Sequence, residues 1–309
     1  MIKVFIDGSA GTTGLKIVER MEKREDVLLL SISEDKRKDP LAKKEILNQA
    51  DVVFLCLPDE AAKESVSLID NPSTVVIDTS TAHRTNPDWV YGLLELGDEV
   101  YESVKSKKRI CVPGCHASGF IALVNPLIES GLVPKDYPFS CTSLTGYSGG
   151  GKAMIADYED IDRDPSLSLP RIYALGQEHK HLKEMKHFTK ISNFPSFTPI
   201  VLDIYSMMCV IVNIEQEGLE YKKTLDVFKK KYEGRPLIKV EGNEEVFSQT
   251  FLPTDLMKNK DSMVIKIGGK DGRISLMALY DNLGKGASGA ALQCFNVLTG
   301  CDETSSLNI

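Results

Sequence analysis

The sequence predicts an α/β protein with two domains, a doubly wound parallel sheet followed by an α+β domain. In the first third of the chain, short apolar runs without polar alternation are separated by helical segments, as in parallel sheets covered on both faces. A glycine-rich turn follows the first of these runs, and beyond residue 199 the chain becomes rich in predicted strands. A length of 309 residues is sufficient for two cores.

The first apolar run, Ile2–Ile6, is predicted to be a buried strand that leads directly into a glycine-rich turn. The glycines have the spacing GxxGxxG rather than the commoner GxGxxG, and Leu15–Lys23 continues as a helix. Glycines allow a tight turn and close backbone approach, and the free amides of a helix start can hold a pyrophosphate. We interpret the turn as the dinucleotide-binding loop of a Rossmann-like domain; the alternative is a turn without a ligand. The candidate cofactor contacts are Gly8, Ser9, Gly11, Thr12, Thr13 and Gly14.

The second predicted strand, Val27–Ser33, ends in a charged segment where the ribose of a dinucleotide would lie. Glu34, about 20 residues beyond the third glycine, is where an acid that binds a ribose 2′-hydroxyl is expected. The following cations, Lys36, Arg37 and Lys38, could neutralise a 2′-phosphate instead. These residues alone leave NAD and NADP open, and a solvated loop is the alternative.

Two further apolar runs, Ala50–Pro58 and Ser73–Asp78, complete the alternation of strand and helix. The formal net charge of −7 argues against a dedicated nucleic-acid surface but leaves room for an anionic substrate held by a local cation. No run approaches the roughly 18 apolar residues of a membrane span. The seven cysteines form no CxxC pair, so we expect a cytoplasmic protein with reduced thiols.

A single cysteine stands in Pro113-Gly114-Cys115-His116, between a helix-breaking dipeptide and a predicted helix, Ala117–Glu129. The positive end of a helix dipole favours the thiolate over the thiol, which makes Cys115 a candidate nucleophile. A core cysteine is the alternative. After this helix, a predicted strand, Phe139–Tyr147, leads into Ser148-Gly149-Gly150-Gly151-Lys152. Exposed amides and one lysine suit a carboxylate or phosphate, unless the segment is a flexible turn.

The segment Gln177–Met185 has helical character and carries two of the five histidines. On a regular helix His181 and Glu184 share a face, so the carboxylate could orient an imidazole that serves as a base. His179 would lie on roughly the opposite side, and both histidines can serve one site only if the helix starts here or the chain is extended at His179. A His-x-His pair can also bind a metal, but no third ligand cluster accompanies it, so we expect no metal.

The rest of the chain is predicted to be rich in strands. The strand candidates are Met207–Ile214, Ser262–Gly268 and Arg273–Asp281, and Tyr221–Tyr232 is predicted to be a helix. The last helix, Ala290–Leu298, is apolar and is expected to pack back on the first domain. We therefore predict a nucleotide-binding domain of residues 1–115 with the C-terminal helix 286–309, and a catalytic and dimerisation domain of residues 116–285.

With these motifs, the chain closely resembles the N-acetyl-γ-glutamyl-phosphate reductase family in its shorter second type. That family is related to the aspartate-semialdehyde and glyceraldehyde-phosphate dehydrogenases, so the resemblance implies a substrate domain of the semialdehyde dehydrogenase type. The resemblance runs nearly end to end. The matching stretches are Gly8–Gly14, Ala50–Asp59, Asp78–Leu93 (DTSTAHRTNPDWVYGL), Pro113–Phe120 (PGCHASGF), Gly146–Lys152, Glu178–Met185 (EHKHLKEM) and Asp281–Gln293.

The resemblance implies an enzyme of arginine biosynthesis that uses NADP. It would reduce N-acetyl-L-glutamyl 5-phosphate to the 5-semialdehyde, with release of phosphate, through a thioester on Cys115. In the stretch that matches the family's catalytic histidine segment, we favour His181 as acid and base, oriented by Glu184. His179 would bind substrate or share the role.

The resemblance also implies binding residues. Substrate contacts fall on Arg84 as the anion-binding arginine and on Tyr147, Ser148, Gly149 and Lys152. Asn282 and Gly286 are expected to contact the cofactor near the nicotinamide. Ser33 and Arg37 are expected to bind the 2′-phosphate of NADP. One departure from the family is Leu93–Leu96, where a proline is expected before the glutamate, which puts the geometry of that loop in doubt.

Three functions stay open at this point: the reductase, a relative acting on another acyl phosphate such as an aminoadipyl or carrier-protein-linked one, and a non-enzymatic NADP-binding sensor. A sensor has no need to keep Cys115, the histidine segment and the substrate loop together. The expected partner is a small-molecule substrate, without nucleic acid or membrane, and the strand-rich domain could bury a sheet face in a dimer or tetramer.

Overall fold

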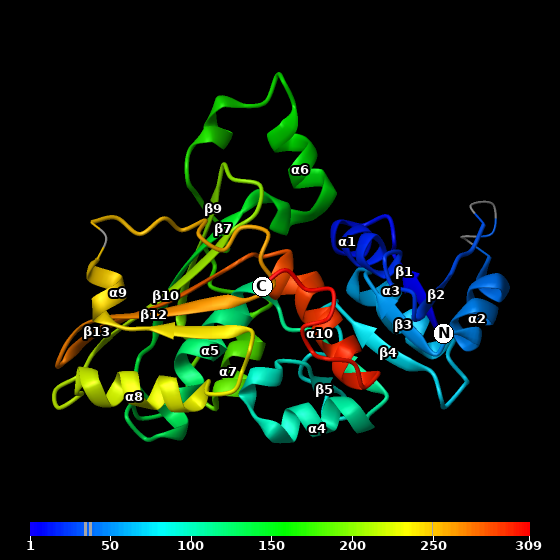
Figure 1. The fold of residues 1–309 in the computed structure, drawn as a ribbon. Coiled ribbons are helices and arrows are strands. Elements are labelled where there is room, and N and C mark those ends of the chain that lie inside the picture. The colour runs from blue at the N-terminus through cyan, green and yellow to red at the C-terminus, as the bar shows by residue number, and fades with distance from the viewer. Residues whose placement is uncertain (34–35, 37–38, 249) are drawn as a thin grey trace. The chain divides into compact units, whose positions relative to one another are not determined.

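The computed structural model describes residues 1–33, 36, 39–248 and 250–309, and the chain divides into two compact units (Figure 1). The first unit comprises Met1–Pro113 and Ala290–Leu307. The second comprises Gly114–Gly289 with Asn308–Ile309, so Cys115 stands at the start of the second unit.

The first unit is built on a six-stranded sheet in which every pairing is parallel. The strand order is β2-β1-β3-β4-β6-β5. The chain therefore runs outward from β1 to β2 and returns to β3, so the order reverses beside β1, the place where doubly wound sheets bind ligands at the carboxyl ends of their strands. The strands are β1 (Ile2–Asp7), β2 (Val27–Leu30), β3 (Val52–Leu55), β4 (Val75–Asp78), β5 (Val90–Tyr91) and β6 (Arg109–Cys111).

Helices cover both faces of this sheet. Val4 and Ile6 of β1 pack in one apolar cluster, and Phe5 between them packs in a second cluster, which explains why the strand lacks polar alternation. The first cluster includes residues of α1 (Thr12–Met21), α4 (Asp98–Ser106) and α10 (Gly289–Leu298). The second includes residues of α2 (Pro40–Gln49) and α3 (Asp59–Ser67).

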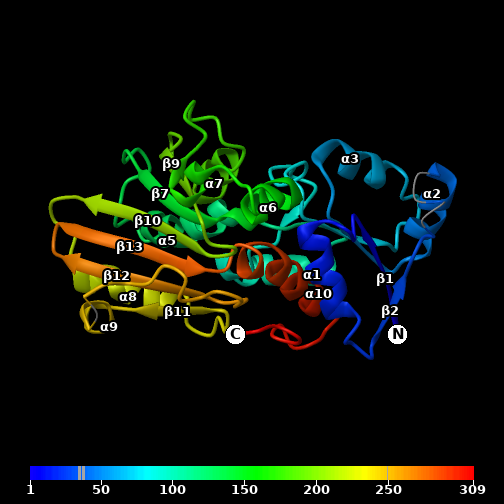
Figure 2. The same cartoon turned by 90° about the horizontal axis from the view of Figure 1, so that it is seen from above.

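The second unit is built on a seven-stranded mixed sheet in the order β11-β12-β13-β10-β7-β9-β8. The pairs β7 with β9 and β11 with β12 are parallel, and the other pairs are antiparallel. Figure 2 shows β10, β13 and β12 side by side. The strands are β7 (Ser140–Gly146), β8 (Arg171–Ile172), β9 (Ser196–Leu202), β10 (Met208–Glu215), β11 (Ile238–Glu241), β12 (Met263–Lys270) and β13 (Arg273–Tyr280).

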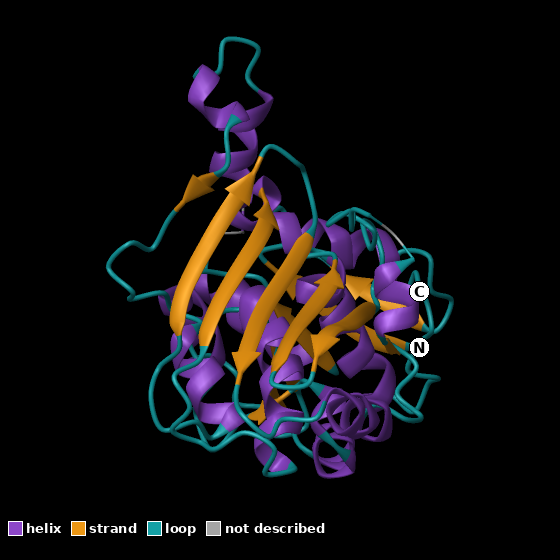
Figure 3. Ribbon diagram, turned by 90° about the vertical axis from the view of Figure 1, so that its left-hand side faces the viewer, coloured by secondary structure: helices purple, strands orange, loops and turns teal. Residues whose placement is uncertain are grey.

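Helices gather on one face of this sheet, behind it in Figure 3. The helix α5 (Cys115–Glu129) packs against β10 and β13, and α7 (Leu182–Thr189) and α8 (Tyr221–Lys231) pack against α5. Two further helices of the unit are α6 (Gly151–Glu159) and α9 (Asn243–Phe247). On the opposite face, apolar side chains such as those of Leu144, Ile211 and Met277 stay half-buried. The sheet thus has one covered and one partly open face.

Two polar contacts fix α5 on the sheet. Every residue of the helix from His116 to Ile128 is buried. The Tyr280 hydroxyl of β13 donates a hydrogen bond to the Cys115 carbonyl and accepts one of 3.0 Å from the Gly119 amide. A Cβ at Gly119 would lie 2.6 Å from that hydroxyl, so only glycine permits the approach. In the first turn of the helix, His116 Nδ1 lies 2.7 Å from Ser143 Oγ of β7.

We expect His116 to make the stability of the fold depend on pH. Burial, helped by the neighbouring His179, lowers the pKa of His116 from 6.5 to about 3. The unfolded imidazole gains a proton below pH 6.5 while the folded one does not, so this contribution is complete above pH 6.5 and is lost as the pH falls toward 3. One proton corresponds to about 1.4 kcal/mol per pH unit, or about 2 kcal/mol between pH 7 and pH 5.

Urea unfolding of the wild type and of His116→Asn at pH 7 and pH 5 measures this contribution. The variant should be less stable at both pH values but should lose about 2 kcal/mol less on acidification. A variant whose stability falls as steeply as that of the wild type would show that His116 takes up no extra proton on unfolding.

Candidate active site

Cys115 is the first residue of α5, with Gly114 as the N-cap, and its side chain is half-exposed. The free amides of the first helical turn and the helix dipole favour negative charge at this place. A Cβ at Gly286 would lie 3.0 Å from the Cys115 Cβ, so this glycine keeps one side of the cysteine open. The geometry suits a thiolate that meets a ligand.

Glu184, in the first turn of α7, is 2% exposed and contacts the chain beside Cys115. Its Oε2 accepts a hydrogen bond of 2.9 Å from the Gly114 amide. The role expected for this carboxylate from the sequence is to orient His181, and its contact with Gly114 is a finding of the structure. Through it, α7 sets the position of the residue that precedes the cysteine.

Three histidines gather beside the start of α5. The ring centres of His116 and His179 are 5.3 Å apart, those of His116 and His181 are 5.5 Å apart, and those of His179 and His181 are 4.7 Å apart. Both histidines of the His-x-His pair reach one place because α7 begins only at Leu182, with His181 as its N-cap. The sequence analysis extended the helix back to Gln177, which is wrong, since residues 177–181 form no regular helix.

The hydrogen bonds around these rings indicate where the protons lie. The His181 amide donates to His179 Nδ1 at 3.1 Å, so a neutral His179 carries its proton on Nε2. His179 is half-buried, whereas His181 is only 5% exposed.

His116 and Tyr173 belong to the same cluster, although the sequence analysis assigned a role to neither. His116 Nε2 lies 2.7 Å from the Tyr173 hydroxyl. Burial and the charge of Cys115 raise the pKa of Tyr173, so the phenol stays protonated and donates to the imidazole. The only signal in the sequence for His116 was its place directly after the cysteine.

The expected substrate loop follows β7. Asn282 is buried, and its Nδ2 donates to Ser148 Oγ at 3.0 Å while its Oδ1 accepts from the Met207 amide at 3.0 Å. A Cβ at Gly149 would lie 3.5 Å from the same Asn282 amide nitrogen. Asn282, expected near the nicotinamide, therefore ties the substrate loop to the start of β10.

The other two loop candidates differ in their environment. Tyr147 stacks on Tyr158 of α6, with ring centres 4.5 Å apart, and its hydroxyl donates to Glu159 at 3.3 Å. Lys152 is exposed in the first turn of α6. The segment that carries them projects beyond the ends of β7 and β9 (Figures 1 and 3).

In the first unit, Arg84 is held in a loop that follows β4. Its Nη2 donates to the Thr79 carbonyl at 2.8 Å, and the residue is 7% exposed. Buried Asp78 organises this loop, because its carboxylate lies 2.7 Å from His83 Nδ1 and accepts a hydrogen bond of 2.7 Å from Ser80 Oγ. The guanidinium is thus positioned by a rigid loop.

The loop between β1 and α1 has the geometry that a pyrophosphate requires. Gly8 has φ of +83°, and a Cβ there would lie 2.3 Å from the Cys56 carbonyl oxygen. A Cβ at Gly14 would lie 2.3 Å from the Gly8 carbonyl oxygen. The helix begins at Thr12 with Gly11 as N-cap, so the amides of Thr12, Thr13 and Gly14 are the free donors of its first turn. These residues, with Ser9, fit a bound dinucleotide.

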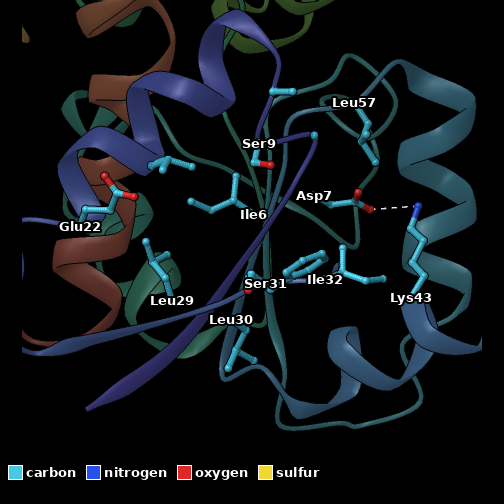
Figure 4. A pocket seen from close by; sticks show the side chains of 14 residues that line it. Ile6, Asp7, Ser9, Glu22, Leu29, Leu30, Ser31, Ile32, Lys43 and Leu57 are labelled. Carbon is cyan, nitrogen blue, oxygen red and sulfur yellow. Dashed lines mark ion pairs between the residues drawn. The ribbon is translucent and has the colours of Figure 1, made fainter. Parts of the chain in front are cut away.

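A cavity of about 530 Å³ adjoins this loop at the carboxyl ends of β1 and β2 (Figure 4). Its lining includes Ser9, Ser31, Ile32 and the ion pair of Lys43 with Asp7, in which Nζ and Oδ2 are 3.0 Å apart. Of the two residues expected at a 2′-phosphate, Ser33 is exposed beside this region, and Arg37 lies outside the described residues, as do Glu34 and Lys38.

Three further features bear on the chemistry. All seven cysteines lie among the described residues and are free thiols. Within the described ranges, no group of three or more His, Cys, Asp or Glu residues could hold a metal ion. In the same part of the chain, no helix has the length and apolar character needed to cross a membrane.

Two family models together match most of the chain. Residues 3–104 match the semialdehyde dehydrogenase NAD binding domain, and residues 115–282 match the semialdehyde dehydrogenase dimerisation domain. Among solved structures, aspartate semialdehyde dehydrogenase II of Vibrio cholerae has a TM-score of 0.72 at 16% identity, covering 97% of this chain and 98% of that one. Aspartate semialdehyde dehydrogenase of Candida albicans with NADP has a TM-score of 0.65 at 15% identity, covering 97% and 98%. These structures confirm the fold.

Curated relatives are closer in sequence. The N-acetyl-gamma-glutamyl-phosphate reductase of Brucella anthropi is 41% identical over 96% of this chain and 98% of its own. The N-acetyl-gamma-glutamyl-phosphate reductase of Chelativorans sp. is 40% identical over 96% of this chain and 97% of its own. The chain therefore belongs to the semialdehyde dehydrogenase family and, within it, to the N-acetyl-gamma-glutamyl-phosphate reductases.

Proposed function

We propose that the protein reduces N-acetyl-L-glutamyl 5-phosphate to N-acetyl-L-glutamate 5-semialdehyde with NADPH and releases phosphate, as a step of arginine biosynthesis. The observation that carries the proposal is Cys115, placed at a helix start directly before His116, whose ring centre lies 5.3 Å from that of His179 and 5.5 Å from that of His181. It stands in a chain that is 41% identical to a curated N-acetyl-gamma-glutamyl-phosphate reductase.

In the proposed reaction, the Cys115 thiolate attacks the acyl carbon of the substrate. A carbon–sulfur bond forms, the carbon–oxygen bond to phosphate breaks, and phosphate leaves with its electron pair. A thiolate is both a good nucleophile and a good leaving group, so the resulting thioester can be released as an aldehyde after reduction. The start of α5 stabilises the thiolate before the attack and after the release.

The two histidines of the pair receive different roles in this proposal. The sequence favours His181 as acid and base, but His179 is half-exposed and carries its proton on Nε2. We assign His179 as the donor to the acyl oxygen, where negative charge develops in both steps. Buried His181 fixes the tautomer of His179 through its amide.

When bound, a dinucleotide would supply the hydride that reduces the thioester. The loop with Gly8, Ser9, Gly11, Thr12, Thr13 and Gly14 would hold the pyrophosphate. The family model shows an NAD-binding domain, and the finer choice of NADP over NAD is part of this proposal. Ser33 and Arg37 stay our sequence-based candidates for the 2′-phosphate, and Gly286 leaves room beside Cys115 for the nicotinamide.

For the substrate, we assign Arg84 to an anionic group, and Ser148, Gly149, Tyr147 and Lys152 to the loop that receives the acyl chain. Asn282 supports this loop through its bond to Ser148. The match of residues 115–282 to a dimerisation domain supports a homo-oligomer, and the second unit has a partly open sheet face with apolar residues.

The first prediction from this function concerns Cys115. In the reverse direction, the enzyme should reduce NADP with N-acetylglutamate semialdehyde and phosphate or arsenate. Cys115→Ser should lower kcat by about 10³-fold or more, because the hydroxyl is a much weaker nucleophile. Absorbance of NADPH follows the reaction. Cys301→Ser, at another half-exposed cysteine, is the matched control and should keep wild-type turnover.

The same assay separates the alternatives. Turnover with an aminoadipyl or carrier-linked semialdehyde, but not with the acetylated glutamate compound, would keep the mechanism and refute the substrate. Tight NADP binding without turnover on any of these aldehydes would support the sensor and refute the enzyme.

The second prediction concerns the two histidines. We expect His179→Asn to lower kcat by about 10²–10⁴-fold with little change in KM, because a donor to the developing charge is lost. His181→Asn should lower kcat by a smaller factor. Steady-state kinetics of both variants measures the split. A larger loss for His181→Asn would support the assignment from the sequence instead, and equal, mild losses would refute both.

The third prediction concerns Arg84. A bidentate guanidinium contact to an anion is worth about 1.5–3 kcal/mol, so Arg84→Ala should raise KM for the acyl phosphate about 10–100-fold. Circular dichroism should show an intact fold, because Asp78 and His83 hold the loop without the arginine. A KM equal to that of the wild type rules out an anion-binding role.

A further inference from the structure

The cavity beside the glycine loop is lined by a cation, Lys43, that belongs to none of the motifs in the sequence. It lies at the carboxyl ends of β1 and β2, where the order of the parallel strands reverses. In a doubly wound sheet this place receives the adenosine half of a dinucleotide. Among the described residues that line the cavity, Lys43 is the one cation, and Asp7 and Glu22 are the acids.

Lys43 is held in the cavity by the start of α2. Pro40 is the first residue of the helix, and the Asp39 side chain caps it by accepting from the Leu41 amide at 2.9 Å. The Asp39 carbonyl accepts from the Lys43 amide at 3.0 Å, which places the lysine in the first turn. Its side chain is 19% exposed and points toward Asp7 (Figure 4). The neighbouring Lys44 pairs with Asp70 instead.

Asp7 holds the ammonium in place. It is the last residue of β1, directly before Gly8, and its Oδ2 accepts from Ser65 Oγ at 2.8 Å and lies 3.0 Å from Lys43 Nζ. A carboxylate at the start of a pyrophosphate loop repels phosphate unless a cation neutralises it. Because both side chains are largely buried, salt screens this pair less than a surface pair.

The geometry of the pair leaves the ammonium able to bind a second anion. A lysine has three donors, and the contact with Asp7 uses one of them. The Asp7 carboxylate accepts from Ser65 and pairs with Lys43. The ammonium therefore has donors left for the 2′-phosphate of NADP, whereas the 2′-hydroxyl of NAD carries no charge to attract it.

We propose that Lys43 binds the 2′-phosphate of NADP and that Asp7 positions its ammonium, so that this pair determines the preference of the enzyme for NADP over NAD. The proposal rests on the dinucleotide site of the proposed function. It adds to Ser33 and Arg37 a residue on α2, beyond the charged segment that follows β2.

Calorimetric titration with two fragments tests the proposal without turnover. The probes are adenosine 2′,5′-bisphosphate, which carries the 2′-phosphate, and 5′-AMP, which lacks it. Lys43→Met should lower the affinity for the bisphosphate about 10–100-fold and the affinity for 5′-AMP by less than about 3-fold. Lys43→Arg should retain most of the affinity. Lys44→Met, one residue away on the exposed side of the same helix, should match the wild type.

A double variant separates direct binding from neutralisation of Asp7. If Lys43 contacts the 2′-phosphate, the double variant Asp7→Asn/Lys43→Met still binds the bisphosphate and 5′-AMP with similar affinities. If Lys43 only neutralises Asp7, the single variant weakens both fragments equally and the double variant restores both, which overturns the proposal.

Two further outcomes are informative. Unchanged affinity of Lys43→Met for the bisphosphate, in a variant with wild-type thermal unfolding, also overturns the proposal while leaving the dinucleotide site intact. A wild type that binds neither NADP nor the bisphosphate refutes the proposed function itself, and this inference with it.

Discussion

The candidate active site depends on how one apolar helix is fixed against its sheet. The helix α5 is buried on nearly all sides, so its apolar surface alone does not define its rotation about its own axis. Tyr280 of β13 and Ser143 of β7 supply that definition, the first through the Cys115 carbonyl and the Gly119 amide and the second through His116 of the helix. Each such buried hydrogen bond contributes about 1 kcal/mol, but losing one partner costs about 1–3 kcal/mol, so the helix has one favourable rotation. That rotation fixes the direction of Cys115 and brings the His116 ring next to those of His179 and His181.

Both units also place a carboxylate beside a group of backbone amides that should receive an anion. Glu184 accepts from the Gly114 amide at the start of α5, and Asp7 precedes the glycine loop at the start of α1. Each carboxylate would oppose the thiolate or the pyrophosphate through repulsion. In the structure each is engaged by neighbouring donors, Gly114 in one case and Ser65 with Lys43 in the other. Glu184 thereby holds the backbone before Cys115, and Asp7 holds the Lys43 ammonium.

Much of this organisation could be predicted from the sequence, and what could not depends on contacts between distant segments. The apolar runs around Val52 and Val75, which lack polar alternation, correctly predict β3 and β4. A strand that is buried on both faces is apolar throughout, so its composition alone reports it. The predicted start of α7 at Gln177 is wrong because this residue has a φ of +57°, outside the helical region. Two hydrogen bonds of 2.8 Å to the backbone of Phe197 in β9 hold it there. No pattern within residues 177–185 reports that bond. The role of His116 likewise depends on Ser143 and Tyr173, far along the chain.

The same distinction applies to the cofactor. The family match establishes an NAD-binding domain, but recognition of a 2′-phosphate depends on the local balance of charge, which the glycine spacing of the loop does not describe. In this cavity Asp7 and Glu22 would leave two negative charges facing an anionic ligand if Lys43 were absent. The lysine lies on α2 rather than in the segment after β2, and it reaches the cavity because the cap at Asp39 fixes the first turn of the helix. If Lys43 acts as we propose, the cofactor preference of this protein is set by a helix start that carries no recognisable motif.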